Sequence, residues 1–143
     1  MALFRKNKKT IPALRSTNTR HEQVTVEYNG CTIQVDKKMA PLLVLMWSRG
    51  IDTEYSCQGD TNLFVDQNCY EADRYRAYIQ MPRTSTSMNF IGELVYNSHL
   101  LREESVSWLI EYNENPVTKT QRIVIRFPSS DIHKLMDTIE GWN

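Results

Sequence analysis

Hydrophobic and polar residues alternate on both sides of an Asn-Gly pair near the start of the chain. Residues 24–35 read Val-Thr-Val-Glu-Tyr-Asn-Gly-Cys-Thr-Ile-Gln-Val. Asn-Gly is typical of a type I′ hairpin turn, because both central residues of that turn need a positive φ. A turn at Asn29 and Gly30 places Tyr28 opposite Cys31 and gathers the apolar side chains of both strands on one face. The pattern therefore predicts a β-hairpin with this register.

A nearly continuous apolar stretch follows at residues 39–50. Pro41 suits the first turn of a helix, and Gly50 suits the left-handed residue that ends one. Asp36 and Lys38 are both candidates for the N-cap. Because the stretch is apolar almost all round, we expect a central, well-buried helix.

The order of two strands and a helix is predicted twice more along the chain. Period-two alternation predicts strands at 51–55, 75–81, 106–112 and 123–127, and helical spacing predicts helices over 90–95 and 132–139. Residues 60–74 show no period, which is typical of a lid, a binding loop or a mobile segment. The sequence thus predicts an α+β fold, one antiparallel sheet built from three ββα units. Its helices lie on one face, and the other face is open or paired with another subunit.

Charge is distributed unevenly along a chain that is neutral overall. Six of the 17 Lys and Arg residues lie in 1–20, where there is no acid, so residues 21–143 hold 11 bases and 17 acids, a formal charge of −6. We therefore expect a basic flexible N-terminal arm at 1–20 and a single α+β domain at 21–143. The acidic domain disfavours nucleic acid as a partner, except through the arm.

Composition narrows the class of protein further. With 143 residues, 41% hydrophobic and 24% charged, the chain resembles an average globular domain. No apolar run approaches the roughly 18 residues that span a bilayer, and the first residues lack the apolar segment of a signal peptide. The sequence predicts a cytoplasmic protein without a membrane partner.

Cys57 is the candidate nucleophile, because it lies in a tight turn, Tyr-Ser-Cys-Gln-Gly, after a predicted strand. A base would have to come from one of three histidines that no spacing ties to Cys57, namely His21, His99 and His133. The alternative is a small buried thiol at a turn. A zinc site from Cys57, Cys69 and a histidine lacks the paired ligand spacing of known sites, so the sequence predicts no metal and no cofactor.

The polar face of the predicted sheet carries several arginines beside a tyrosine. Guanidinium groups with an aromatic ring can hold a phosphorylated or nucleotide-like ligand, although pairing with Glu27, Glu54 and Glu111 is the alternative. Leu109 and Val124 on the same face suggest a partner subunit. The residues expected to bind a small anion are Ser56, Cys57, Gln58, Gly59, Arg76, Tyr78, Arg122 and Arg126.

About a third of the chain, residues 35–81, resembles a set of small bacterial and phage proteins. The shared pattern comprises Val-Asp at 35–36, Ala-Pro-Leu-Leu at 40–43, Met-Trp at 46–47, Gly-Ile-Asp-Thr at 50–53, Tyr-Ser-Cys-Gln-Gly at 55–59 and Ala-Tyr-Ile at 77–79. Met81 stands where that pattern has an aromatic residue. The resemblance is compatible with a phage-encoded protein and brings no assigned activity.

A second, fainter similarity is to the wybutosine-synthesis methyltransferase family. The Thr-Ser-Ser-Cys-Ser-Gly-Arg element of that family resembles Thr53 followed by Ser-Cys-Gln-Gly at 56–59, with Asp60 in place of the arginine. This resemblance would imply S-adenosylmethionine and tRNA chemistry.

Three functions are compatible with these observations. The first is a non-catalytic, homo-oligomeric binder of a small anionic, nucleotide-derived ligand, such as a phage protein that sequesters a host signal. The second is a protein–protein inhibitor or assembly module that uses the open sheet face. The third is an enzyme that depends on Cys57 or modifies tRNA.

Overall fold

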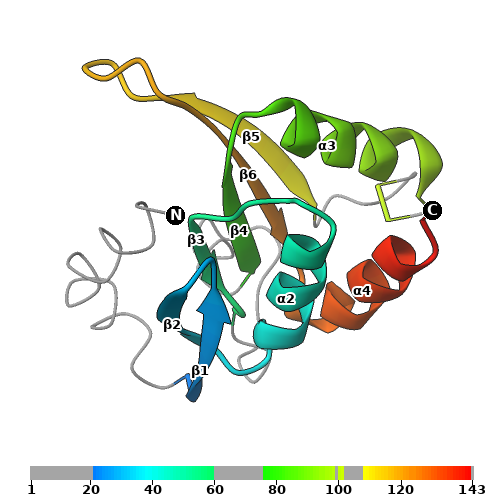
Figure 1. Ribbon diagram of the computed structural model, residues 1–143. Helices are drawn as coiled ribbons and strands as arrows, with labels where there is room; N and C mark the ends of the chain where they lie inside the picture. The colour runs from blue at the N-terminus through cyan, green and yellow to red at the C-terminus, as the bar shows by residue number, and fades with distance from the viewer. Residues whose placement is uncertain (1–20, 60–75, 99, 102–107, 143) are drawn as a thin grey trace.

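The computed structural model describes residues 21–59, 76–98, 100–101 and 108–142 (Figure 1). The expected basic arm at 1–20 and the expected loop at 60–74 lie outside these residues.

The described strands form two antiparallel sheets, so an α+β fold is confirmed. One sheet pairs β1 (Gln23–Tyr28) with β2 (Cys31–Asp36). The other has the order β3-β4-β6-β5, from β3 (Tyr55–Cys57), β4 (Ala77–Pro82), β5 (Leu109–Glu114) and β6 (Gln121–Phe127). Because the first hairpin forms a sheet of its own, a single sheet shared by three ββα units is not confirmed.

The first hairpin has the predicted turn and register. Tyr28 pairs with Cys31, and the ladder continues to Gln23 opposite Asp36. Asn29 and Gly30 adopt φ values of 52° and 75°, as a type I′ turn requires. The register leaves Asp36 at the end of β2, where the chain turns toward the first helix.

The described residues form three α-helices, each after a pair of strands: α2 (Ala40–Ser48), α3 (Ser85–Asn97) and α4 (Ile132–Glu140), the last preceded by a 3₁₀ turn at Ser129–Asp131. Met39 occupies the N-cap of α2 without a side-chain hydrogen bond, so neither Asp36 nor Lys38 caps it. Helix α3 begins with a capping box, in which the backbone N–H of Ser87 donates to Thr84 Oγ1 at 3.1 Å. Gly50, with φ at 79°, ends α2 as predicted.

The helices lie on one side of the four-stranded sheet (Figure 1). Alternate residues of β4 and β6, such as Ile79 and Ile125, point to this inner face and are fully buried. They join one apolar cluster with helix residues that include Leu43, Leu94 and Leu135. The opposite, outer face carries the intervening residues of the same strands.

Three predicted strands begin later than expected, and one of them is β4, which starts at Ala77 rather than 75. β3 starts at Tyr55 rather than 51, and the buried Thr53 before it accepts a hydrogen bond from Trp47 Nε1 at 3.0 Å. β5 starts at Leu109, and residue 106 lies outside the described residues. Tyr112 was expected to point into the core, but it is 58% exposed near the end of the edge strand β5. Among the described helices, none has the length and apolar character needed to cross a membrane.

Candidate functional site

The structure brings three of the predicted binding residues together on the outer face. Cys57 of β3 lies directly opposite Tyr78 of β4, which lies directly opposite Arg126 of β6. The Arg126 guanidinium lies over the Tyr78 ring, 5.4 Å from its centroid. Arg122 occupies the other end of β6, opposite Pro82. The outer face thus holds a Cys-Tyr-Arg row at one end and Arg122 at the other.

Both arginines of β6 are paired with carboxylates. Arg126 Nε lies 2.7 Å from Glu111 Oε1, and Arg122 Nε lies 2.8 Å from Glu54 Oε1. The pairing considered from the sequence is therefore present at Glu54 and Glu111. Because these ion pairs are already formed, the arginines of β6 add no net positive charge for an anion at this face.

Glu54 is the more deeply buried of the two acids. Its side chain is 1% exposed, and burial raises its pKa above the usual value, although Arg122 and Gln80 oppose the shift. A raised pKa means that the folded state holds the proton more tightly than the unfolded state. The associated stability is therefore present below pH 4.5 and is lost as the pH rises through the folded-state pKa.

We expect the substitution Glu54→Gln to remove this pH dependence. Glutamine cannot titrate, so the free energy of unfolding of the wild type, minus that of the variant, should decrease as the pH rises above 4.5. Urea unfolding at a series of pH values measures this difference. A difference that is flat or increases with pH would contradict the raised pKa.

The predicted turn at 56–59 begins inside a strand, because Ser56 and Cys57 are the last two residues of β3 and only Gln58 and Gly59 lie beyond it. Gln58 makes hydrogen bonds with two other segments of the chain. The backbone N–H of Gln58 donates to Asp36 Oδ2 at 2.9 Å, and its side-chain Oε1 accepts from the backbone N–H of Lys38 at 3.0 Å. The Gln58 carbonyl accepts from the Ser129 hydroxyl. Gly59 follows with φ at 74°, a conformation that favours glycine. The turn therefore has a fixed geometry and places Cys57 against the end of β2.

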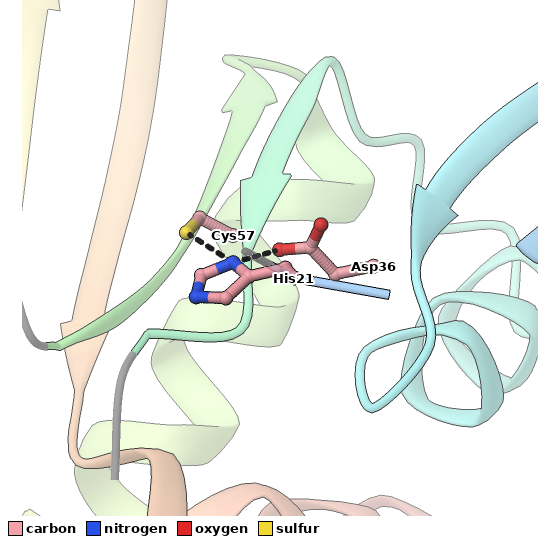
Figure 2. A group of neighbouring side chains, drawn as sticks. All are labelled: His21, Asp36 and Cys57. Carbon is pink, nitrogen blue, oxygen red and sulfur yellow. Dashed lines mark hydrogen bonds and ion pairs between the residues drawn. The ribbon is translucent and has the colours of Figure 1, made fainter. Parts of the chain in front are cut away.

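Beside this turn, three side chains converge: His21, Asp36 and Cys57 (Figure 2). His21 Nδ1 lies 3.1 Å from Asp36 Oδ2 and 3.8 Å from Cys57 Sγ. The side chains of His21 and Asp36 are 8% and 2% exposed, and Cys57 is 5% exposed. One nitrogen, one oxygen and one sulfur thus meet in a buried position.

The Asp36 carboxylate is oriented by neighbouring amides. Its Oδ1 accepts from Gln23 Nε2 at 3.1 Å, while Oδ2 accepts from the Gln58 backbone. These donors fix the carboxylate so that Oδ2 faces His21. Such hydrogen bonds to a ligand side chain are typical of the outer shell of metal sites.

The arrangement differs from a nucleophile–base–acid triad. In a triad the imidazole contacts the nucleophile with one nitrogen and the acid with the other. Here the same nitrogen, Nδ1 of His21, is nearest to both Asp36 and Cys57. The ring points toward both partners through one atom (Figure 2). Donor atoms that converge in this way are suited to binding one metal ion.

Tyr78, beside Cys57, is a neutral neighbour. Burial raises the pKa of Tyr78 to about 12, with the nearby Cys57 adding to the shift and Arg126 opposing it. The phenol therefore keeps its proton at neutral pH and adds no negative charge to the cluster.

Sequence reasoning found Cys57 but not its partners. The sequence offers His21 as one of three possible bases or zinc-binding histidines and Asp36 as a helix cap, and these two residues lie 36 and 21 positions before Cys57. The sequence prediction of no metal site rested on ligand spacing, which does not register residues so far apart. A signal was present in the hairpin register, which pairs Asp36 with Gln23 and brings the start of β1 beside the end of β2. His133 is exposed on α4, and residue 99 lies outside the described residues.

The described residues thus form an α+β protein with a buried N/O/S cluster. Comparisons with protein-family models, curated proteins and solved structures found no match to this chain. Both resemblances drawn from the sequence therefore stay predictions, and the function has to be argued from the site itself.

Proposed function

We propose that the protein binds a zinc-class transition-metal ion through His21 Nδ1, Asp36 Oδ2 and Cys57 Sγ. The observation that carries the proposal is the convergence of these three atoms, all within 4.8 Å of one another. Imidazole, carboxylate and thiolate are the usual ligands of zinc in proteins.

The distances suit one shared ion. Zinc lies about 2.0–2.2 Å from nitrogen or oxygen and about 2.3 Å from sulfur, so a tetrahedral site separates its ligand atoms by about 3.3–3.6 Å. The two distances from His21 Nδ1, 3.1 and 3.8 Å, bracket these values. The sulfur and the carboxylate would move closer together when the ion binds.

A site of this kind also explains why a thiol and a carboxylate share a buried position. A carboxylate away from water is costly unless it is paired or coordinates a metal. Three protein ligands leave one position of a four-coordinate ion for water or another donor, which is typical of catalytic zinc sites.

The bound ion would also support the anion site expected at 56–59. The two charges of the ion would be balanced by the Cys57 thiolate and the Asp36 carboxylate, so an anion would bind by direct coordination at the open position and not through net positive charge. A small anion at the fourth position therefore remains a proposal for the ligand of this protein. A homo-oligomer is a further proposal, although Val124, once expected at the interface, is only 3% exposed within the chain.

Cobalt substitution tests the metal site directly. We expect Co²⁺ to give a near-ultraviolet thiolate-to-metal absorption band that saturates at about one ion per chain, because a thiolate ligand produces such a band. The band should be lost in Cys57→Ser. It should persist in the double variant Cys31→Ser/Cys69→Ser, which keeps Cys57 as its single cysteine.

The double variant is the matched control, because Cys31 lies outside the cluster, in the β2 register opposite Tyr28. A band that survives Cys57→Ser, or disappears from the double variant, would show that Cys57 is not the sulfur ligand.

A further inference from the structure

A cavity lies away from the His21 cluster, where the segments after α2 and α4 meet α3. Its volume is about 500 Å³, within the range of small-molecule sites. It is lined by Arg49, Ile51, Thr86, Asn89, Phe90, Glu93, Gly141 and Trp142. Four of these residues belong to α3, and the other four lie in the segments that follow α2 and α4, so the cavity forms where the ends of two helices meet a third.

The cavity carries one positive and one negative charge. The Arg49 side chain donates to the Trp142 carbonyl at 2.9 Å, and Glu93 accepts from Asn97 Nδ2 at 2.9 Å. Within the described part of the chain, Arg49 has no carboxylate partner and Glu93 has no cationic partner. This contrasts with Arg122 and Arg126 on the sheet, each of which faces a glutamate.

The apolar wall of the cavity is aromatic. The rings of Phe90 and Trp142 meet edge to face, with centroids 5.7 Å apart and an interplanar angle of 67°. Phe90 and Ile51 are only 3% and 4% exposed, so the partly exposed Trp142 presents most of this apolar surface. A wall of this kind favours a flat or branched apolar group in the ligand.

We propose that this cavity binds an amino-acid-like zwitterion with an aromatic or branched side chain. Arg49 would bind its carboxylate through the guanidinium fork, and Glu93 would bind its ammonium group. The side chain would lie against Phe90 and Trp142. A zwitterion has one negative and one positive group, and the cavity offers one cationic and one anionic side chain to pair with them.

The same balance disfavours a nucleotide. A phosphate carries up to two negative charges, and Glu93 would repel them without a second cation among the lining residues. The cavity is therefore expected to bind an amino acid more tightly than a nucleotide, and this difference can be tested with small ligands.

L-Phenylalanine is the probe, and the indole N–H resonance of Trp142 is the reporter. We expect a saturable shift of this resonance, with a Kd of about 1 mM or tighter. The indoles of Trp47 and Trp108 donate to Thr53 and Asp131, so their resonances should not move. The variant Trp142→Phe assigns the reporter peak.

Matched changes in ligand and protein test each contact. N-acetylphenylalanine lacks the ammonium group, so it should bind wild type and Glu93→Gln equally, whereas phenylalanine should bind Glu93→Gln about 10-fold more weakly. Phenylalaninamide lacks the carboxylate, so it should bind wild type and Arg49→Gln with the same affinity. Arg83→Gln, which changes an arginine outside this cavity, is the control.

The proposal is overturned if phenylalanine leaves the Trp142 resonance unmoved at about 50 mM, which is roughly 50 times the expected Kd. It is also overturned if Arg49→Gln and Glu93→Gln both bind phenylalanine like the wild type, or if adenosine monophosphate alone produces the shift.

Discussion

Replacing His21 with alanine is expected to weaken Zn²⁺ binding by about 100-fold or more. Structural zinc sites bind with apparent free energies of at least about 10 kcal/mol, which shared among three ligands gives about 3 kcal/mol for each. Each 1.4 kcal/mol corresponds to about a factor of ten in affinity. His21 Nδ1 lies 3.1 Å from Asp36 Oδ2 and 3.8 Å from Cys57 Sγ, and its loss would leave the ion with only one oxygen and one sulfur ligand from the cluster. Competition with a chromophoric chelator measures the change.

His133→Ala is the matched control, because His133 is an exposed histidine on α4 and should leave zinc affinity unchanged. The stability of the fold gives a second measurement. Zinc at 100 times its Kd should raise the free energy of unfolding of the wild type by about 2.7 kcal/mol, and a chelator should remove that gain. If His21→Ala shows the same zinc-dependent gain as the wild type, the metal lies elsewhere in the protein.

The local parts of the fold could be predicted from the sequence because their causes are local. Asn29 and Gly30 specify a turn whose backbone angles few other residue pairs adopt, and that turn fixes the register of twelve paired residues. Pro41 and Gly50 likewise frame α2, since one tolerates the first turn and the other supplies a positive φ. In each case the signal and the structure span the same few residues.

The assembly of those parts could not be predicted in the same way. Alternation shows that a strand has one buried face, but it does not show which strand lies beside it. The first hairpin therefore matched its prediction in detail, while its place in a sheet shared by three units is not confirmed. The candidate site could not be predicted either, because His21, Asp36 and Cys57 come from three separate stretches of the sequence. Their meeting depends on hydrogen bonds from Gln58 to β2, which no local pattern encodes.

Asp36→Ala is expected to destabilise the metal-free protein by about 3 kcal/mol. The carboxylate accepts hydrogen bonds from the Gln58 backbone and the Gln23 amide, and it lies 3.1 Å from His21 Nδ1. Alanine would leave these three buried or half-buried polar groups without their acceptor, at about 1 kcal/mol or more for each. Urea unfolding in the presence of a chelator measures this loss independently of any metal.

Asp36→Asn separates the structural role of this residue from its proposed metal role. The asparagine carbonyl can still accept from the Gln58 backbone, so the metal-free variant should lose only about 1 kcal/mol, the value of a typical net hydrogen bond. The neutral amide oxygen is a poorer ligand for zinc than a carboxylate, so zinc affinity should fall nearly as far as in Asp36→Ala. If metal-free Asp36→Asn is only slightly less stable than the wild type but binds zinc much more weakly, the Asp36 carboxylate is a zinc ligand. If Asp36→Asn instead binds zinc like the wild type, the carboxylate only positions the turn that carries Cys57, and the proposed N/O/S site loses its oxygen ligand.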